Sequence, residues 1–535
     1  MQSSSAGAVA GARTESVVEN NLSRLLKGAF ADLPSLVHAT ALARPDHVAV
    51  VDGERRLTYR QLDELADRVA AALQRDGVRA GDVAAVCAET SFEYIGIFLG
   101  ILRARAAVTP LPISASAASL AGMLRDCGAK VLFLDAAAAN RLAETDDVPE
   151  LNRVAIDDHL PQNLLADWMK RDNPTPNRVA IQPEDWFNII YSSGTTGTPK
   201  GIIQSHQMRW GHIRRGEVLL YDEESIAVIS TPMYSNTTLV SLVPALARGG
   251  TLVLMKKFNA LEFLRLCEKE RATHAMLVPV QYRRIMDLPE FDSFDLSSFR
   301  MKTCTSSPFA ADLKADVLKR WPGALVEIYG MTEGGGTCLL HATEFPNKLH
   351  TVGRPAAGHD IRVIDEEGRC VEQGQCGEVV GHSGAMMTGY LGQPEKTREA
   401  EWYDSEGKRF IRTGDIGRFD EDGFLILVDR KKDMIISGGF NIYPSDLEAV
   451  LRGHESVAEA SVVGVPSRQW GETPVAFVVL RAGREVSAES LRSWVNERVG
   501  KTQRLSDLIF VDALPRNALG KVLKTALRES YKGQL

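Results

Sequence analysis

An α/β fold with largely parallel sheets is predicted because helical and strand patterns alternate from about residue 33. The chain of 535 residues is also too long for one hydrophobic core, which stops growing at roughly 250–300 residues. Hydrophobic residues make up 44% of the chain and charged residues 24%, which is ordinary for a globular protein. Wholesale disorder, collagen and coiled coil are therefore excluded, and division into domains is expected.

The first clear element is a helix that begins after Thr58. Thr58 and Gln61 have the spacing of a capping box, and the apolar residues that follow lie on one helical face. A short buried strand is expected over 83–86, a helix over 94–102 and another strand over 130–134. Repeated β-α-β order of this kind favours parallel sheets.

The chain is predicted to divide unevenly. Residues 1–30 begin with a stretch rich in Ser, Ala and Gly and are expected to form a disordered tail. A charged run, DRKKD, marks a boundary between a large N-terminal domain of mixed, mainly parallel sheets with flanking helices (31–431) and a small α+β C-terminal domain (432–535). Within the latter, Ser445 and Glu448 have capping-box spacing, and Glu448 is assigned to helix capping rather than catalysis.

Charge and cysteine content exclude several classes of function. The net charge of −7 repels polyanions, so nucleic acid is not expected as a partner. Seven scattered cysteines without a C-x-x-C pair suggest neither a disulfide framework nor a zinc site, and they favour a cytoplasmic location. No apolar stretch approaches the ~20 residues that a membrane span needs. A homodimer is compatible with the sequence but not indicated by it.

The most informative segment follows a predicted buried strand over 186–191. The next ten residues, SSGTTGTPKG, combine flexible glycines, hydroxyl groups and one lysine, a composition suited to gripping phosphate. The segment is not a Walker A loop, because Pro199 stands where that motif needs Gly and Gly201 stands where it needs Ser or Thr. A flexible surface turn has the same composition, so the residues alone leave both interpretations open.

Five segments in the same order resemble the signatures of the adenylate-forming (ANL) superfamily, which contains acyl-CoA synthetases, luciferases and the adenylation domains of peptide synthetases. These are the loop at 192–201, YGMTE at 329–333, RTGD at 412–415, the hinge and glycine loop within 430–448, and PRNALGK at 515–521. The resemblance spans essentially the whole chain from residue 33. It implies the superfamily's fold, in which a small C-terminal domain rotates about a hinge.

The resemblance also implies a site for ATP. The residues expected to hold its β- and γ-phosphates are Ser192, Ser193, Gly194, Thr195, Thr196, Gly197 and Lys200. Thr332 would donate to the α-phosphate, and Glu333, with Thr196, would hold Mg²⁺, an ion that usually takes one or two protein carboxylates. A Thr-Glu pair alone would more often start a helix.

Five further residues are expected around the nucleoside. Tyr329 and Gly330 would lie against adenine, and Glu327 stands where the superfamily places a polar side chain facing the adenine amino group. For Glu327 the alternative is a solvated carboxylate at a strand end. Asp415 would bind the ribose, with Arg430 as a second contact, whereas a turn-forming Asp is the alternative suggested by Gly414.

The C-terminal motif implies a mobile catalytic group. Lys521 would enter the site for the first half-reaction and stabilise charge as a carboxylate attacks the α-phosphate. Lys432 would be the hinge, and Gly438 and Gly439 would then leave space for the pantetheine arm of coenzyme A. A tight turn before the next helix is the other reading of these glycines, and both can hold together.

The acyl pocket is expected around Tyr234, Ser235, Asn236, Ser306 and Met331. Peptide-synthetase domains place an Asp near Asn236 to pair with a substrate amino group, and an ammonium buried beside an uncharged amide would be costly. An amino acid substrate is therefore disfavoured, and an aryl, arylalkanoic or medium-chain acid fits the residues better.

The function predicted from these features is AMP-forming ligation of a carboxylic acid to coenzyme A, with ATP, Mg²⁺ and coenzyme A taking part. A stand-alone adenylating enzyme that passes its acyl group to a separate carrier protein is one alternative. A nucleotide-binding regulator that has lost catalysis is another, although Lys200, Glu333, Asp415 and Lys521 are all present.

Overall fold

A computed structural model describes residues 21–157, 163–172, 174–192, 200–437, 440–517 and 520–532. Within the segment predicted to be a tail, residues 21–27 are helical, and Leu22, Leu25 and Leu26 pack against the main hydrophobic core. Disorder is therefore not a property of residues 21–30. Residues 1–20 lie outside the described residues.

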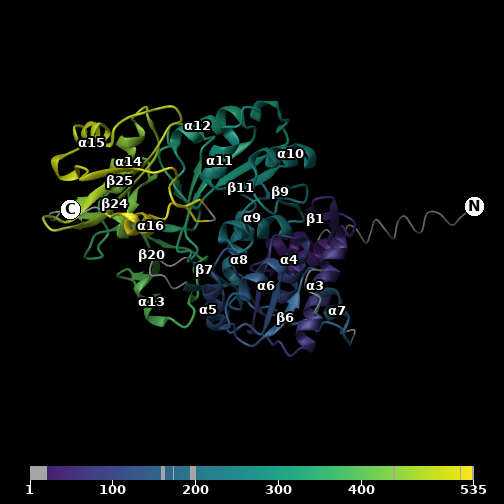
Figure 1. Ribbon diagram of the computed structural model, residues 1–535. Helices are drawn as coiled ribbons and strands as arrows, with labels where there is room; N and C mark the ends of the chain where they lie inside the picture. The colour runs from purple at the N-terminus through teal and green to yellow at the C-terminus, as the bar shows by residue number, and fades with distance from the viewer. Residues whose placement is uncertain are drawn as a thin grey trace, which may run out of the picture.

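Two sheets, largely parallel, form the large N-terminal part of the chain (Figure 1). One has seven strands in the described ranges, in the order β18 (Gly389–Tyr390), β8 (Lys200–Ser205), β7 (Trp186–Ser192), β4 (Ala107–Pro110), β3 (Val83–Cys87), β5 (Val131–Leu134) and β6 (Asn152–Ala155). The other has nine, in the order β15 (Arg354–Pro355), β14 (Cys338–His341), β13 (Ala324–Tyr329), β12 (Met301–Cys304), β11 (His274–Leu277), β9 (Ile226–Ile229), β10 (Thr251–Leu254), β1 (Val48–Asp52) and β2 (Arg55–Thr58).

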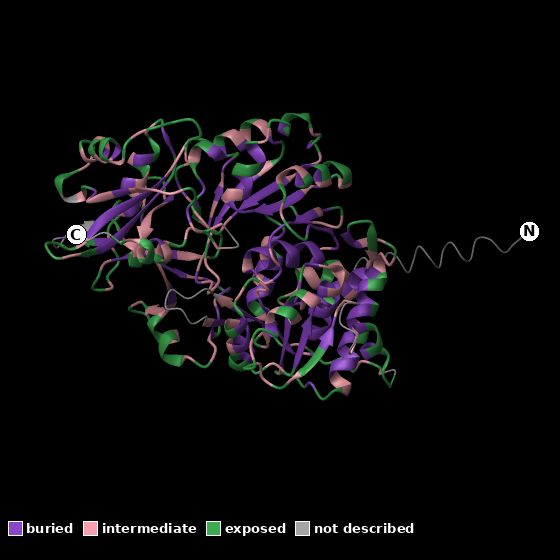
Figure 2. Cartoon of the chain, viewed as in Figure 1, coloured by how far each residue is buried: buried purple, intermediate pink, exposed green. Residues whose placement is uncertain are grey.

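Helices cover both faces of these sheets, so the large part is layered. The layer between the sheets contains α2 (Leu33–Ala43), α3 (Tyr59–Arg75), α4 (Phe92–Arg103), α8 (His206–Arg215) and α9 (Asn236–Ala247). The outer faces carry α5 (Ala117–Cys127) and α6 (Ala136–Leu142) on one sheet, and α10 (Ala260–Glu270), α11 (Pro279–Met286) and α12 (Ala311–Arg320) on the other. A short helix, α7 (Leu165–Lys170), packs beside α3. Figure 2 shows the resulting pattern, with buried strands inside and exposed helix faces outside.

The central layer depends on a close approach between α3 and α4. The predicted capping box at Thr58 and Gln61 is present at the start of α3. A Cβ on Gly100 would lie 2.5 Å from the Cβ of Val69, so only glycine lets the two helices approach this closely. Val69 is fully buried there, which contributes about 1.5–3 kcal/mol for a side chain of its class.

Two smaller sheets complete the fold. The first is antiparallel, in the order β16 (Asp360–Ile364), β17 (Gly377–His382), β20 (Arg409–Phe419) and β19 (Glu401–Tyr403), with β21 (Leu425–Arg430) paired to β20 and α13 (Pro394–Glu399) beside β19. The second is C-terminal, in the order β23 (Phe440–Ile442), β22 (Ile435–Ser437), β25 (Gly471–Leu480) and β24 (Val457–Ser467), with β26 (Asp507–Phe510) paired to β25.

The C-terminal sheet has its own hydrophobic core, which it shares with α14 (Pro444–Arg452) and α15 (Ala488–Asn496), while α16 (Lys524–Ser530) packs on β24. In Figure 1 these elements gather on one side of the molecule. A single turn of 3₁₀ helix at Lys431–Asp433 joins β21 to this part. The described ranges contain no helix with the length and apolar character needed to cross a bilayer.

The large domain of mainly parallel sheets and the small α+β part confirm the predicted fold class. The prediction of a capping box at Ser445 and Glu448 is wrong. Helix α14 begins earlier, at Pro444, with Tyr443 as the N-cap, because proline suits the first helical position. Glu448 instead accepts a hydrogen bond from the Val462 amide at 2.9 Å and pairs with Lys524 at 2.9 Å.

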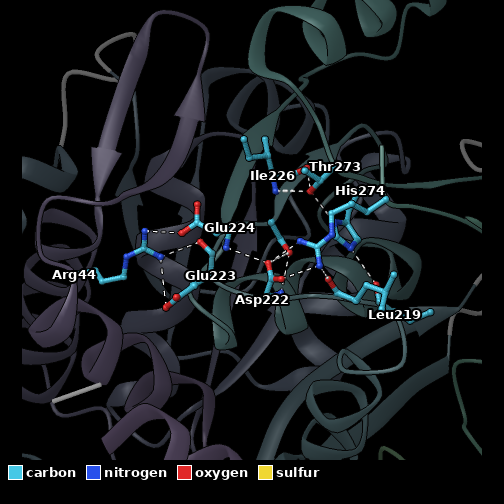
Figure 3. A network of polar contacts seen from close by, with 11 residues as sticks. Arg44, Leu219, Asp222, Glu223, Glu224, Ile226, Thr273 and His274 are labelled. Carbon is cyan, nitrogen blue, oxygen red and sulfur yellow. Dashed lines mark hydrogen bonds and ion pairs between the residues drawn. The ribbon is translucent and has the colours of Figure 1, made fainter. Parts of the chain in front are cut away.

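A polar network lies at the amino ends of β9, β11 and β12, three central strands of the nine-stranded sheet (Figure 3). Arg44, after α2, donates to the Glu223 carbonyl and to the Glu224 carboxylate, and His274 Nε2 contacts the Leu219 carbonyl at 3.0 Å. Burial lowers the pKa of His274 to about 4, so this imidazole is neutral at physiological pH. The network lies at the amino ends of the strands and leaves their carboxyl ends for a ligand.

Candidate active site

A cavity of about 920 Å³ lies between the large domain and the C-terminal residues. Its walls include residues that follow the carboxyl ends of β7, β9, β12 and β13, together with α8, the first turns of α9 and the linker after β21. In α/β proteins ligands bind in the crevice outside the carboxyl ends of the strands. The position of the cavity is therefore the one that the fold makes available.

The predicted phosphate loop joins β7 to β8, which pair antiparallel, so a strand rather than a helix follows the loop. Ser193, Gly194, Thr195, Thr196 and Gly197 lie outside the described residues, as does the side chain of Ser192. Lys200, the first residue of β8, lines the cavity, and its Nζ lies 5.1 Å from the centre of the Tyr390 ring.

Glu333 and Thr332 form part of a turn after β13, not the start of a helix, and both line the cavity. The Tyr390 hydroxyl donates to Glu333 Oε1 at 2.9 Å, and the Gln204 amide donates to the Thr332 carbonyl at 2.6 Å. One carboxylate whose Oε2 accepts no hydrogen bond from the described residues fits a Mg²⁺ ion that draws its remaining ligands from water and phosphate. The described residues hold no group of three metal-binding side chains, so a dedicated protein cage is absent from them.

The predicted ribose site is organised by Asp415, which is 8% exposed. Asp415 Oδ2 accepts from the Tyr329 hydroxyl at 2.8 Å, and Oδ1 pairs with Arg430 Nε at 2.6 Å. A carboxylate has about four lone-pair positions, so both oxygens keep capacity for a ligand hydroxyl. Arg430, Gly330 and Gly414 line the cavity, whereas Tyr329 and Asp415 are not among its lining residues and reach it only through these neighbours.

Glu327 does not face the cavity. It is 4% exposed and forms a buried ion pair with Lys314 of α12, whose ammonium also donates to the carbonyls of Leu349 and Thr351. Burial raises the pKa of Glu327, and Lys314 opposes that rise. This arrangement matches neither the predicted contact with adenine nor the alternative of a solvated carboxylate; the residue holds α12 against β13.

Lys521 lies in the same cavity as Lys200, Thr332 and Glu333. Its loop is closed by Asn517, whose side chain accepts from the Lys521 amide at 3.0 Å. Burial, with the nearby charges of Arg430 and Lys432, lowers the pKa of Lys521 to about 8. The predicted hinge, Lys432, is exposed and lines the cavity from the linker.

The loop that carries Lys521 packs against the large domain through Gly520. This residue has φ of +77°, and a Cβ at this position would lie 2.3 Å from Cγ1 of Val280 in α11. The left-handed backbone and the close approach both require glycine. Two other predicted residues of the C-terminal part, Gly438 and Gly439, lie outside the described residues.

The five residues predicted for the acyl pocket all line the cavity: Tyr234, Ser235, Asn236, Ser306 and Met331. Ser306 has φ of +83°, an unusual conformation for serine, and its hydroxyl is hydrogen-bonded to Thr237 at 2.6 Å. The Gln204 amide donates to Asn236 at 3.4 Å. Gln204 thus positions the side chain of Asn236, and this position carries an uncharged amide rather than a carboxylate.

The cavity also contains residues that were not predicted from the sequence, and three of them carry polar or charged groups next to predicted ones. Tyr390 comes from the short strand β18, and His212 and Arg215 come from α8. The signal for the pair on α8 is their three-residue spacing on a helix that follows the phosphate loop. For Tyr390 no local motif exists, because its partners Lys200 and Glu333 are distant in the sequence.

Two family models match the chain. The model described as AMP-binding enzyme matches residues 37–391, and the model described as AMP-binding enzyme C-terminal domain matches residues 446–521. Together they cover both the large part of the chain and the part that carries Lys521.

Curated relatives and solved structures are similar along nearly the whole chain. 4-coumarate-CoA ligase 1 of Narcissus pseudonarcissus is 31% identical, with 90% of each chain covered. Fatty acid–[acyl-carrier-protein] ligase ScoC of Streptomyces coeruleorubidus is also 31% identical, over 94% of this chain and 97% of the relative. The crystal structure of ATP-bound MatB from Rhodopseudomonas palustris superposes with a TM-score of 0.84 at 27% identity, covering 94% of this chain and 99% of MatB.

Proposed function

Because the chain belongs to the AMP-binding enzyme family of the adenylate-forming superfamily and is an acid–thiol ligase of the acyl-CoA synthetase type, we propose that it joins an aryl, arylalkanoic or medium-chain carboxylic acid to coenzyme A in two steps. The carboxylate attacks the α-phosphate of ATP, forming acyl-AMP and releasing pyrophosphate. The thiol of coenzyme A then attacks the acyl carbon, the thioester forms, and AMP leaves. A mixed anhydride divides one difficult condensation into two easier ones.

The observation that carries this proposal is the presence of Lys521 in the cavity with Thr332, Glu333 and the acyl residues. In the first step a negative charge develops between the carboxylate and the α-phosphate. The Lys521 ammonium and the Thr332 hydroxyl would stabilise that charge, while Lys200 would bind the departing phosphates. Glu333 would hold Mg²⁺, which neutralises phosphate charge when it is bound. Such local cations are needed because the net charge of the chain is −7.

The second step needs a different arrangement around the same acyl group. Lys521 comes from the C-terminal part and lines the same cavity, so this lysine would withdraw before a thiol reaches the acyl group. We assign the rotation to the linker at Lys432, which stands between β21 and β22 and is exposed. Rotation would bring Gly438 and Gly439 toward the acyl-AMP.

The lining of a second cavity, of about 690 Å³, favours a thiol acceptor that carries phosphate groups. It adjoins the glycine loop and is lined by Phe440 and Trp470 and by the cations of Arg492, Lys501 and Arg504. Aromatic faces and cations suit the nucleotide of coenzyme A. They also suit a phosphopantetheine arm, and the similarity to ScoC favours a carrier protein as the second candidate acceptor.

Release of pyrophosphate and of AMP tests the proposal. A panel of aryl, arylalkanoic and straight-chain acids is offered with ATP and Mg²⁺, first alone, then with coenzyme A, then with a phosphopantetheinylated carrier protein. Acid-dependent pyrophosphate release and thioester formation with coenzyme A are expected. Thioester formation with the carrier protein alone would move the function to the second candidate. Absence of acid-dependent pyrophosphate release would refute both.

A further inference from the structure

Helix α8 presents a row of basic residues to the interior. His206, Arg209, His212 and Arg215 follow one another at intervals of three residues, so each is a surface neighbour of the next, while the row turns by about 180° around the helix between His206 and Arg215. The first three are buried, and Arg215, in the last turn, lines the cavity together with His212. Cations are seldom buried unless they are paired with an anion.

The hydrogen-bond donors of Arg209, in the middle of this row, are paired with neutral groups. Arg209 donates to the Asn188 side chain at 2.7 Å, to the side-chain oxygen Oε1 of Gln204, and to Nδ1 of His212 at 3.1 Å. Gln204 in turn holds the Thr332 carbonyl at 2.6 Å. Arg209 therefore has a structural role: it fixes α8 and β8 beside the residues predicted to act on the α-phosphate.

Arg215 is different, because no described residue supplies a counter-ion for its charge. Its contact in the described residues is with the Thr337 hydroxyl, at 3.3 Å, and none of them forms an ion pair with it. Burial lowers the pKa of Arg215 to about 10, so it stays charged at neutral pH. Burial and the charges of Arg209, Arg215 and His359 keep the pKa of His212 well below its usual value. Arg209 and Arg215 thus place two positive charges on this helix, and none of the described residues forms an ion pair with Arg215.

The position of Arg215 relates this charge to the acyl pocket. Helix α8 packs against α9, and the first turns of α9 and the residues before it supply Tyr234, Asn236 and Val240 to the same cavity. Thr337, the partner of Arg215, also lines that cavity. The groups predicted to bind phosphate, Lys200 and Lys521, belong to other elements.

We propose that the acid activated by this enzyme carries a second carboxylate, remote from the one that is adenylated, and that Arg215 and the Thr337 hydroxyl bind this second carboxylate. The planar guanidinium matches a carboxylate in a two-bond arrangement, which a neutral acyl end cannot form. This inference rests on the proposed function and narrows its substrate class. The remote carboxylate supplies the counter-ion that Arg215 lacks and sets the orientation of the acid.

The test compares acids that differ in one end group. Pyrophosphate release is measured with ATP and Mg²⁺ for straight-chain diacids from succinate to sebacate, for terephthalate and for para-carboxycinnamate, each against the monoacid of the same skeleton. We expect at least one diacid to exceed its monoacid by about 10- to 100-fold in kcat/KM, as a charge-assisted contact predicts. Arg215→Gln should reduce the diacid-to-monoacid ratio by about the same factor.

Two further variants separate binding of the acid from folding. Arg214→Gln removes an exposed charge from the same helical turn and should leave the ratio unchanged. Arg215→Lys keeps the charge but loses the planar fork, and it should give an intermediate ratio. The melting temperature of Arg215→Gln without ligand should not fall, because the substitution removes an unpaired charge.

Three results would overturn the inference. One is a wild-type preference for the monoacid in every pair, and another is a ratio that Arg215→Gln does not change. The third is a fall in melting temperature that accounts for the loss of activity with both kinds of acid. Failure of every acid, mono or di, to release pyrophosphate would instead refute the proposed function on which the inference depends.

Discussion

Replacement of Gly520 by alanine should weaken the first half-reaction more than the second. A Cβ at this position lies 2.3 Å from Cγ1 and 3.2 Å from Cβ of Val280, both part of α11 in the large domain. Overpacking of this size costs about 1–3 kcal/mol, and it acts only while the C-terminal loop is docked with Lys521 in the cavity. A left-handed alanine adds about 1–2 kcal/mol, but this strain belongs to the loop itself and is present in both domain arrangements.

The packing cost alone therefore predicts a loss of about 5- to 150-fold in acyl-AMP formation. The assay measures pyrophosphate release from ATP and acid for the first half-reaction. For the second, purified acyl-AMP is supplied with coenzyme A and the thioester is measured. Wild-type enzyme and Gly520→Ala are compared in both assays, and the second rate is expected to change by less than about threefold.

Val280→Ala provides the matched control. This substitution removes both Cγ atoms and with them the closest contact, so the double variant Gly520→Ala/Val280→Ala should recover a large part of the lost rate. Val280→Ala alone reports the effect of the missing methyl groups. Equal losses in the two half-reactions, or a double variant no better than Gly520→Ala, would refute the reasoning.

Other predictions follow from the same geometry. Acyl-AMP formation should fall as pH rises through about 8, where the Lys521 ammonium loses its proton, whereas thioester formation from supplied acyl-AMP should not share this limb; a common pH profile would contradict the assignment. Lys521→Ala should lower acyl-AMP formation by about 10²–10³-fold, measured by pyrophosphate release. Glu327→Gln leaves the buried Lys314 without its carboxylate and should reduce the free energy of unfolding by about 3–5 kcal/mol, measured by denaturant titration; an increased KM for ATP at unchanged stability would restore the adenine-facing role. Gly100→Ala should destabilise the protein by about 1–3 kcal/mol through contact with Val69, and no change in stability would show that α3 and α4 can separate without cost.

The elements that could be predicted from the sequence are those whose signals are local. The capping box at Thr58 and Gln61 fixes the start of α3 because both hydrogen bonds are formed within four residues. The box at Ser445 failed although its spacing is equally good. Pro444 immediately before it begins the helix, and this competing signal is also legible in the sequence.

Motif order placed Lys200, Thr332, Glu333, Arg430 and Lys521, and the structure brings all of them to one cavity. What could not be predicted depends on partners that are distant along the chain. Whether Glu327 faces a nucleotide or a lysine is decided by the packing of α12 on β13, and a single strand does not specify what covers each face.

The pairing of Asp415 with Arg430 has a thermodynamic consequence. Arg430 is the last residue of β21 and stands two positions before Lys432. A nucleotide hydrogen-bonded to Asp415 would therefore change the ion pair that Asp415 forms with Arg430 at the start of the linker. If ATP and AMP differ in how they engage this pair, they differ in which domain orientation they favour. Linkage then requires that each orientation change the affinity for ATP relative to AMP by the same factor. The Asp415–Arg430 pair would thereby make acyl-AMP formation precede thioester formation. The domain orientation that admits the thiol would also be the one that binds the adenylate more tightly than ATP.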